Sequence, residues 1–408
     1  MQVARTLAKK KAVEVTLIDK KNHHTFQPLL YQVATTVLSP NEIAFPLRRV
    51  FSRADHVDII MAEVDDLNLD ERKVLLLGAR SLSYDYLVVA AGSRHSYFGH
   101  NEWEKHAPGL KTVEDAIGIR HRILVAFEKA ESKARLERQD KPKPLHFAVI
   151  GGGPTGVELA GAMRDIATKA LARDFNFIDP QQTQVTLYEG ARSILGAFPQ
   201  KLSRKAEAQL WELGVRVRKE TLVTDVQSGR IKAGGEWVEH EVILWATGVS
   251  VSPLAKKLGV ATDRAGRVPV GKDLSLPGRP EVFVVGDMAA LKDENGQVVP
   301  ALASAAMQEG VFVAKAILRE RAGRERGSFR YKDYGSMATI GRHRAVALIG
   351  RLQLSGATAW LMWALVHVLM LIGFRSRMAV FFEWTWAYFT RERSARLIMD
   401  YRSDTMEE

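Results

Sequence analysis

The stretch GGGPTGVELAGA at residues 151–162 decides the fold, because it contains the pattern G-x-G-x-x-G at Gly151, Gly153 and Gly156. The pattern follows an apolar run, LHFAVI at 145–150, and opens an apolar helical segment. In a strand–turn–helix unit the first glycine permits a tight turn, the second lets the backbone approach a pyrophosphate, and the third allows close packing of helix on strand. The helix N-terminus offers unpaired N–H groups to the phosphates. The alternative is a glycine-rich turn without a nucleotide, but the flanking strand and helix favour a dinucleotide-binding unit.

The next buried strand, VTLYEG at 185–190, ends at Glu189. A carboxylate at this place accepts hydrogen bonds from an adenosine ribose and repels a 2′-phosphate, so it favours NAD over NADP. Glu189 lies 38 residues after Gly151, more than the usual spacing of about 20, and we expect an extended helix and loop at 164–182 to account for the difference. Arg192 follows closely and would weaken the exclusion of NADP, so the strict preference stays open.

Further buried strands alternate with helical segments along most of the chain, and a charged helix is expected over about 120–141. Such alternation predicts an α/β fold with doubly wound parallel sheets. These further strands are VEVTLID (13–19), DYLVVAAG (85–92), VILWATG (242–248) and EVFVVGD (281–287).

The ends of three of these strands predict a second dinucleotide site. Asp19 ends the first of them on a carboxylate. AAG at 90–92 and VVGD at 284–287 are glycine turns at the carboxyl ends of buried strands, where ligands bind in such sheets. Gly286 would let the backbone approach the ligand, and the carboxylate of Asp287 would bind its hydroxyl groups.

The amino-acid composition excludes several kinds of redox and metal site. The chain has no cysteine, which excludes structural disulfides, cysteine-ligated iron–sulfur clusters, tetrathiolate zinc and electron transfer through a protein dithiol. The net charge is +11 and the pI is near 9.6, which indicates an anionic partner, either nucleic acid or a membrane surface. A solvated basic surface on a soluble enzyme is the alternative. No nucleic-acid-binding motif is present, so we expect no nucleic acid partner.

The C-terminal part is aromatic and apolar. ATAWLMWALVHVLMLIGF at 357–374 has 18 residues without an acidic or basic side chain other than His367, the lower limit for a membrane span. Tryptophans at 360–386 and nearby arginines fit a membrane–water interface. The segment can be a buried core helix with a partner for His367, a single span, or an amphipathic region docked on one leaflet. Its short length and its histidine favour surface docking. The flanking arginines are Arg375, Arg377, Arg391, Arg393 and Arg396.

Taken together, long motifs in the same order and spacing resemble the bacterial type II NADH:quinone oxidoreductases, and the resemblance covers essentially the whole chain. In that family NADH reduces FAD, and FAD then reduces a membrane quinone. Dithiol flavoprotein reductases and sulfide:quinone reductases share the architecture but need redox cysteines, which this chain lacks. The motifs are NHHTFQPLLYQVA (22–34), AAGS (90–93), GGGPTGVELAGA (151–162), ILWATGV (243–249), VGDMA (285–289), MQEG (307–310), GSMATIGR (335–342), LSGATAWLMW (354–363) and IGFRSR (372–377).

The resemblance implies two Rossmann-like domains and a C-terminal amphipathic helical region that anchors the protein to the membrane. The FAD domain would comprise residues 1–115 and 263–330, the NADH domain 116–262, and the membrane-association domain 331–408. It also implies a ubiquinone or menaquinone partner, an anionic membrane surface, a homodimer, and peripheral attachment to the cytoplasmic face of the bacterial inner membrane.

Site residues follow from the matched motifs. Glu158 and Gln308 are the implied catalytic residues, and Gln308 with Glu309 would contact quinone. Many family members carry a second glutamine at the position of Glu309. A simpler interpretation of Glu158 is a carboxylate stabilised by the dipole at a helix N-terminus. For FAD the implied residues are Asp19, Gln27, Ala91, Gly92, Gly286 and Asp287. For NADH they are Gly151, Gly153, Pro154, Thr155, Gly156, Glu158, Glu189, Thr247 and Gly248.

The first residues predict a helix that precedes the strand at 13–19. A parallel strand that follows a crossover helix requires an earlier strand, and Met1 already lies in the helical pattern. We therefore expect the first strand and the first glycine loop of the FAD domain to be missing from this sequence. A flavin-deficient NADH-binding protein or an inactive gene fragment is the alternative function under this expectation.

Overall fold

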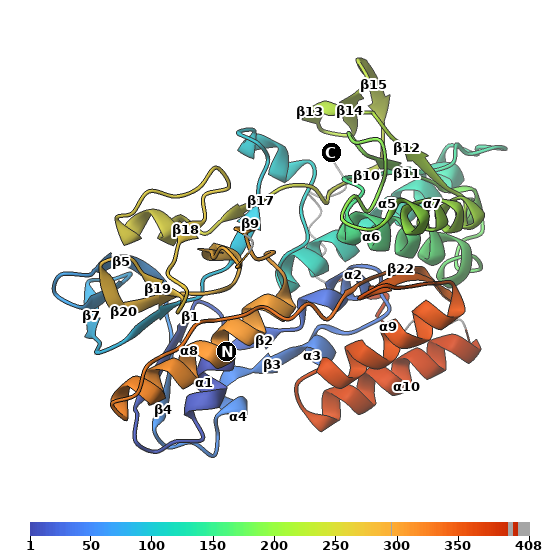
Figure 1. Ribbon diagram of the computed structural model, residues 1–408. Helices are drawn as coiled ribbons and strands as arrows, with labels where there is room; N and C mark the ends of the chain where they lie inside the picture. The colour runs from blue at the N-terminus through green and yellow to red at the C-terminus, as the bar shows by residue number, and fades with distance from the viewer. Residues whose placement is uncertain (295, 391–394, 399–408) are drawn as a thin grey trace. The chain divides into compact units, whose positions relative to one another are not determined.

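The computed structural model describes residues 1–294, 296–390 and 395–398. The chain forms two compact units, each built from three separate segments (Figure 1). Unit 1 comprises Met1–His24, Phe45–Arg94 and Val249–Tyr334. Unit 2 comprises Thr25–Ala44, His95–Gly248 and Gly335–Glu408.

A four-stranded parallel sheet forms the centre of unit 2, in the order β12-β11-β10-β16. Ile150 at the end of β10 is aligned with Tyr188 of β11 on one side and Trp245 of β16 on the other, so these strands end at one edge. The sheet has the strand order of a nucleotide-binding half of a doubly wound fold, as the sequence predicts. The strands are β10 (His146–Ile150), β11 (Gln184–Tyr188), β12 (Val215–Arg218) and β16 (Val242–Trp245).

Helices cover this sheet. α6 (Pro154–Asp165) contacts β10 and β11, and α7 (Gln200–Leu213) contacts β12. α5 is Val113–Leu136, so the predicted helix over about 120–141 begins seven residues earlier than expected. The reason is a capping box, in which Thr112 Oγ1 accepts a hydrogen bond from Asp115 N at 3.1 Å and Asp115 Oδ2 accepts one from Thr112 N at 2.8 Å.

The remaining elements of unit 2 surround this centre. Its segment 25–44 contributes η1 (Gln27–Leu29), α2 (Leu30–Ala34) and α3 (Pro40–Ile43). Three short turns of helix are η2 (Asn101–Lys105), the π-helical η3 (Ile166–Ala170) and η4 (Pro180–Gln182). Two antiparallel sheets consist of β13 (Val223–Gln227), β14 (Arg230–Ala233) and β15 (Glu236–Glu239), and of β22 (Ser336–Gly341), β23 (Arg344–Ile349) and β24 (Leu352–Ser355).

α6 packs directly on β22. A Cβ atom built on Gly161 would lie 1.8 Å from the carbonyl oxygen of Ile340, so only glycine permits this approach. The contact joins the nucleotide-binding helix to the C-terminal segment of the chain within one hydrophobic core, which includes Met163, Ile340 and Trp363.

Unit 1 holds the remaining predicted parallel strands, but in two separate sheets. β1 (Val15–Asp19) pairs with β4 (Val57–Met61), and β8 (Leu87–Val89) pairs with β20 (Arg279–Val284), both in parallel. Among the described residues the second edge of β1 has no paired strand. The expected second doubly wound sheet is therefore present as two pieces, because no strand of the described chain joins β1 to β8 or β20.

The other elements of unit 1 are an antiparallel sheet, short strands, three α-helices and two 3₁₀ turns. α1 (Gln2–Leu7) packs on α8 (Ala303–Arg321), where a Cβ on Gly310 would lie 3.1 Å from Gln2 Cβ. The sheet consists of β5 (Val64–Asn68), β6 (Lys73–Leu76) and β7 (Arg80–Ser83). Also present are α4 (Leu47–Val50), η5 (Pro253–Leu258), η6 (Gly286–Met288), β17 (Val249–Val251), β18 (Val268–Pro269), β19 (Ser275–Leu276) and β21 (Ala289–Ala290). The chain passes between the units in β2 (His23–Thr25), β3 (Ala44–Pro46) and β9 (Ser93–His95).

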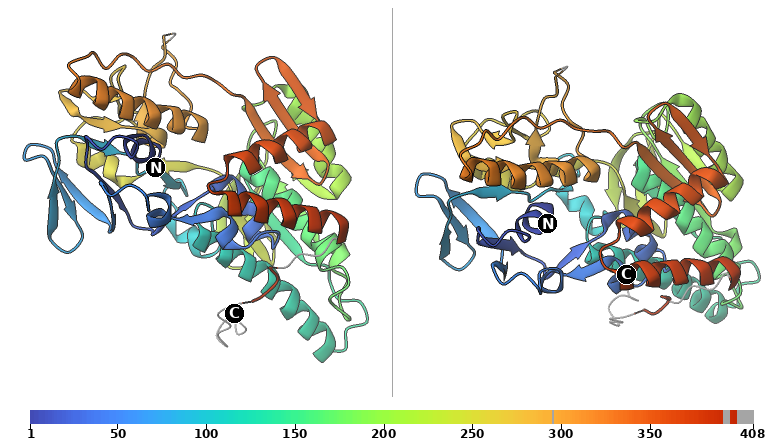
Figure 2. Two further views of the ribbon diagram at one scale, coloured as in Figure 1. Left: turned by 90° about the horizontal axis from the view of Figure 1, so that it is seen from below. Right: turned by 60° about the horizontal axis from the view of Figure 1, so that its bottom comes forward.

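Two C-terminal helices of unit 2, α9 (Ala357–Met370) and α10 (Phe374–Thr390), lie side by side, as all three ribbon views show (Figures 1 and 2). The rings of Trp363 and Trp384 stack between them with centroids 5.3 Å apart. The described part of the chain contains no helix that is both long and apolar enough to cross a membrane. The segment 357–374 is thus not one spanning helix, because α9 ends at Met370.

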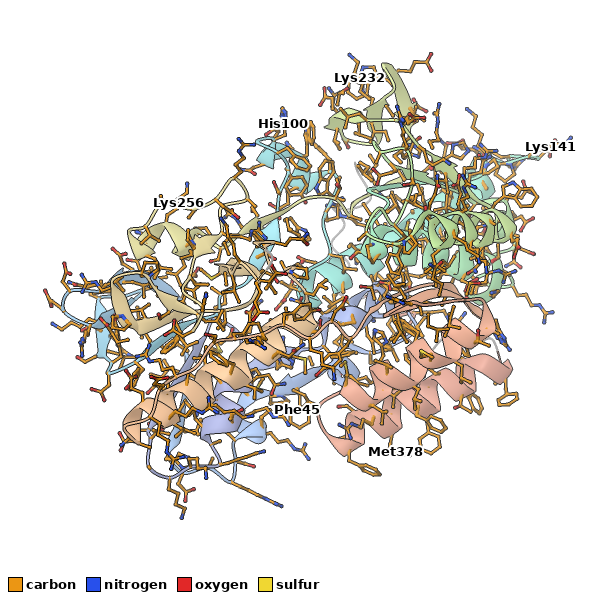
Figure 3. All side chains as sticks on the ribbon, in the orientation of Figure 1. Phe45, His100, Lys141, Lys232, Lys256 and Met378 are labelled. Atoms are coloured by element: carbon orange, nitrogen blue, oxygen red, sulfur yellow. The ribbon has the colours of Figure 1, made fainter. Side chains whose placement is uncertain are left out.

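The interpretation of α9 as a buried core helix is also wrong. Only Ala359 and Trp363 of this helix are buried. Leucines at every fourth position, Leu361, Leu365 and Leu369, are 57–66% exposed. Side chains of α10, around the labelled Met378, likewise project away from the ribbon (Figure 3). Of the expected flanking arginines, Arg391 and Arg393 lie outside the described residues.

Candidate active site

The turn between β10 and α6 has the tight geometry that a dinucleotide requires. Gly151 has φ +111°, and a Cβ on it would lie 2.7 Å from Thr247 Cβ. A Cβ on Gly156 would lie 1.8 Å from the carbonyl oxygen of Gly151, so helix and turn touch. Gly153 caps α6, and Pro154 is its first residue. Proline suits this position because the first N–H of a helix has no partner within it.

The carboxylate of Glu189 is held over the same turn. Its Oε2 accepts a hydrogen bond from Gly152 N at 2.6 Å, and its Oε1 accepts one from Ala191 N at 2.7 Å. Each oxygen keeps a further lone pair for the hydroxyls of a ribose. The structure thus places the predicted ribose acid beside the predicted pyrophosphate turn.

The end of β16 completes this edge of the sheet. Gly248 has φ +76°, and a Cβ on it would lie 2.8 Å from both Phe98 Cζ and Ser96 O. Ser96 N donates to Gly248 O at 3.2 Å, which fixes the close approach. Thr155, at the start of α6, is exposed. The predicted NADH residues other than Glu158 therefore meet at the carboxyl ends of β10, β11 and β16, where nucleotides bind in such sheets.

Glu158 lines a second feature of unit 2, a pocket of about 150 Å³. Burial raises the pKa of Glu158 to about 8, although the backbone N–H of Thr339 partly opposes the shift. The carboxyl group is therefore protonated at neutral pH. The first turn of α6 holds no acidic residue, so the simpler interpretation, a carboxylate stabilised by the helix dipole, does not fit.

Aromatic, apolar and polar side chains form the rest of this pocket, which we call the tryptophan pocket, and the charged Asp165, Lys169 and Arg342 also line it. Trp384 Nε1 donates to Gln32 Oε1 at 2.7 Å, and Gln32 Nε2 donates to Tyr31 Oη at 2.8 Å. Trp363 is buried, and its Nε1 has no hydrogen-bond partner among the residues that the structure describes. A buried N–H without a partner has lost its hydration without compensation, so it suits an acceptor from a ligand. The tryptophan pocket, with the protonated Glu158, can accommodate a neutral ring that carries carbonyl oxygens.

The sequence does not predict the tryptophan pocket. The clustered tryptophans are a signal for it, but their pattern predicts an interfacial position instead. Trp386 is 59% exposed as expected, whereas Trp363 turns inward and is 2% exposed. His367 does find the partner that burial requires, since its Nδ1 lies 2.7 Å from Trp363 O.

In unit 1, three strand ends present hydrogen-bond acceptors. Asp19 ends β1, and its Oδ1 accepts from Lys21 N at 2.8 Å. Asp287 follows β20, and its Oδ2 accepts a hydrogen bond from Ser93 Oγ at 2.5 Å. Gly92, after β8 and Ala91, has φ +65° with open space where a Cβ would stand. Carboxylates and an open glycine fit the ribose and ribityl hydroxyls of FAD.

The two residues predicted to contact quinone have different environments. The Nε2 atom of Gln308 donates to Lys332 O at 2.9 Å and to Ser304 O at 3.1 Å, and its Oε1 accepts from Lys332 N at 3.0 Å. Its amide thus holds the backbone at Lys332. Glu309 is 3% exposed, and its Oε2 accepts from Gly286 N at 2.6 Å. Burial raises the pKa of Glu309 to about 7; the Gly286 N–H opposes this shift.

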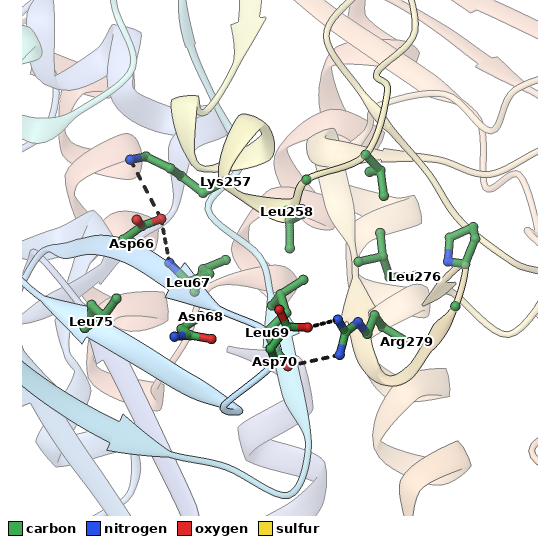
Figure 4. A pocket seen from close by; sticks show the side chains of 14 residues that line it. Asp66, Leu67, Asn68, Leu69, Asp70, Leu75, Lys257, Leu258, Leu276 and Arg279 are labelled. Atoms are coloured by element: carbon green, nitrogen blue, oxygen red, sulfur yellow. Dashed lines mark hydrogen bonds and ion pairs between the residues drawn. The ribbon is translucent and has the colours of Figure 1, made fainter.

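Gln27 belongs to unit 2, where its Nε2 donates to Lys111 O at 3.5 Å. A surface pocket of about 540 Å³ in unit 1 contains ion pairs between Arg279 and Asp70 and between Lys257 and Asp66 (Figure 4). None of the predicted site residues lines that pocket.

Comparisons with known proteins identify the family. The sequence model of the pyridine nucleotide-disulphide oxidoreductases matches residues 1–310, and that of the NDH2 C-terminal domain matches residues 334–392. The type II NADH:quinone oxidoreductase Ndh of Mycobacterium tuberculosis is 41% identical, over 97% of this chain and 87% of its own. The type II NADH:quinone oxidoreductase of Haemophilus influenzae is 29% identical, over 83% of this chain and 81% of its own.

Solved structures agree at the level of the fold. NDH2 of Plasmodium falciparum in complex with NADH superposes with a TM-score of 0.86 at 20% identity, over 98% of this chain and 97% of that chain. The sulfide:quinone oxidoreductase of Aquifex aeolicus gives a TM-score of 0.71 at 16% identity, over 96% and 92% of the two chains. With the nucleotide turn, the ribose carboxylate and the C-terminal helices described above, the chain belongs to the type II NADH:quinone oxidoreductase family.

Proposed function

We propose that this protein oxidises NADH and reduces a membrane quinone, with FAD as the intermediate carrier. The observation that carries the proposal is the nucleotide turn at Gly151–Gly156 with the Glu189 carboxylate held over it by two backbone N–H groups. When bound, FAD would supply the hydride-accepting and electron-donating chemistry that links NADH to the quinone. The whole chain lacks cysteine, so no protein dithiol lies on this route. The comparisons give no support to a flavin-deficient NADH-binding protein.

Different residues of the chain would bind NADH and FAD. The N-terminus of α6 would bind the NADH pyrophosphate, and Glu189 would accept hydrogen bonds from its adenosine ribose. Asp19, Gly92 and Asp287 would hold hydroxyl groups of FAD. On this basis we propose three domains. The FAD domain comprises residues 1–115 and 263–330, the NADH domain comprises 116–262, and the membrane-association domain comprises 331–408.

Reduction of a quinone to a quinol consumes two protons as well as two electrons. Glu158 and Glu309 each have a carboxyl pKa raised by burial into the range where a side chain can hold and release a proton near neutral pH. We assign proton holding to these two carboxyl groups. Gln308 is assigned a positioning role, because its amide is hydrogen-bonded to the backbone of Lys332 and Ser304.

The exposed faces of α9 and α10 are proposed to dock on the membrane. Large apolar side chains are exposed along both helices, where water would otherwise hydrate them. The chain's net charge of +11 adds attraction to anionic lipid. The cytoplasmic face and a homodimer are part of the same proposal and rest on the family resemblance. The exposed side chains are Leu361, Leu365, Leu369, Met370, Phe374, Phe381, Phe382, Trp386 and Phe389.

The test is NADH oxidation by the purified chain bound to vesicles of mixed neutral and anionic phospholipid. We expect oxidation to depend on quinone dissolved in the bilayer and to cease when quinone is omitted. Equal rates with and without quinone, or binding of NADH without oxidation by flavin-loaded protein, would contradict the proposal.

A further inference from the structure

The loop after β12 is attached to the loop that carries the ribose carboxylate. Glu220 N donates to Ala191 O at 3.0 Å, and Thr221 N donates to Glu189 O at 3.0 Å. These hydrogen bonds bring a second carboxylate, that of Glu220, next to the turn that holds Glu189. Both residues follow the carboxyl ends of adjacent parallel strands, β11 and β12.

Glu220 occupies a backbone conformation that glutamate seldom adopts. Its φ is +51°, in the left-handed region where side chains other than glycine, asparagine and aspartate are uncommon. Its side chain is 68% exposed, so burial of apolar surface does not explain its presence there. Strained residues of this kind concentrate at ligand-binding positions.

The basic side chains around this edge already have partners. Arg192 Nε lies 3.5 Å from Glu220 Oε1, and Lys219 Nζ lies 2.8 Å from Glu207 Oε1. The guanidinium of Arg218 stands over the ring of Tyr188 at 6.0 Å from its centroid. The Arg192 side chain is 93% exposed, so this ion pair draws the guanidinium toward Glu220 without immobilising it, and Glu220 competes with any anion for it.

We propose that Glu220 determines the choice between NADH and NADPH, by pairing with Arg192 and adding a second carboxylate beside the 2′-hydroxyl of the adenosine ribose. A 2′-phosphate carries between about one and a half and two negative charges at neutral pH and would meet Glu189 and Glu220 together. Its natural partner, Arg192, already faces the competing carboxylate of Glu220. The proposal rests on the NADH site of the proposed function and makes this chain selective for NADH.

The experiment compares wild type, Glu220→Gln, and the double variant Glu220→Gln with Arg192→Gln. The measured quantity is the ratio of kcat/KM for NADPH to that for NADH, together with the Kd of adenosine 2′,5′-bisphosphate relative to that of 5′-AMP. Glu220→Gln should raise the NADPH ratio and tighten relative bisphosphate binding by about two- to fivefold, the gain expected from one exposed ion pair. The double variant should lose this gain, because the freed guanidinium is gone.

Glu236→Gln is the matched control. Glu236 is an exposed glutamate of β15 in the same unit, so the control removes the same charge and should leave both ratios as in wild type. An unchanged ratio in Glu220→Gln, or an equal rise in Glu236→Gln, would overturn the proposal. Failure of wild type to bind 5′-AMP or to oxidise either nucleotide would instead overturn the proposed function, so the two failures are distinct.

Discussion

Two glutamates of the proposed site have a raised carboxyl pKa, and in both burial is the largest cause. Glu158 lines the tryptophan pocket of unit 2, and Glu309 lies beside Gly286 and Asp287 in unit 1. A carboxyl group that stays protonated near neutral pH can donate a hydrogen bond or a proton, which an ordinary carboxylate cannot. Each carboxyl group by itself is of the kind that quinol formation needs. Glu158→Gln tests the state of the first through stability. The folded pKa of Glu158 is about 8 and its ordinary value is 4.5, so the folded protein holds a proton that the unfolded chain releases between these pH values. Stability conferred by the protonated form is therefore lost as pH rises through this window, by up to about 1.4 kcal/mol per pH unit. Glu158→Gln has no such proton to release. Between pH 5 and pH 8 its free energy of unfolding should therefore rise by a few kcal/mol relative to that of wild type, roughly that slope multiplied by the pH interval. Urea unfolding midpoints of both proteins at the two pH values measure it, and an equal difference at both would contradict the assignment.

Some of the site was predictable residue by residue, and some was not. Gly151, Gly156 and Glu189 belong to a local strand–turn–helix unit. The spacing of these residues along the chain is enough to predict the geometry of that unit. The inward turn of Trp363 depends on packing between α9, α10 and α2, which no local pattern encodes.

At the scale of elements, the packing of α6 on β22 connects the nucleotide turn to the C-terminal segment. Gly161→Ala would place a methyl group 1.8 Å from Ile340 O, so helix and strand must separate. Overpacking of this kind costs about 1–3 kcal/mol or more, and we expect a lower thermal midpoint with weaker NADH binding. Gly118→Ala in α5 is the control, because nothing lies within 4 Å of its added Cβ, and it should stabilise the protein by up to about 1 kcal/mol. Equal effects of the two substitutions on the midpoint would show that the close contact is absent.

A second prediction concerns the outer face of α9. Leu365→Glu places a charge within the exposed leucine stripe and should weaken binding to vesicles of mixed neutral and anionic phospholipid about tenfold, because a half-buried leucine contributes on the order of 1 kcal/mol and the new charge is repelled. Leu136→Glu, at an 81% exposed leucine of α5, carries the same change away from that face. Equal binding of the two variants in a vesicle sedimentation assay would rule out α9 as the docking surface.

Elements with a strong local signal, such as β10 and the start of α6, were predictable from sequence. The early start of α5 was not, because it depends on a capping box. The two-piece arrangement in unit 1 was not either, because it depends on pairing between distant strands.

At the scale of the whole molecule, composition and family membership agree on the route of the electrons. The chain matches the pyridine nucleotide-disulphide oxidoreductase model over residues 1–310 yet has no cysteine in its 408 residues. The electrons must therefore pass from flavin to acceptor without a protein disulfide, which separates this chain from relatives of the same fold that use one. In the docking that we propose, the charge of +11 and the exposed apolar faces of α9 and α10 would supply attraction to a membrane, where quinones reside. The most direct measurement is the visible absorption of flavin bound to the 408-residue chain, followed by rapid mixing under anaerobic conditions. We predict that NADH bleaches the flavin band and that a quinone restores it within the turnover time. A chain that retains no flavin, or a bleached flavin that quinone does not reoxidise, would contradict the account.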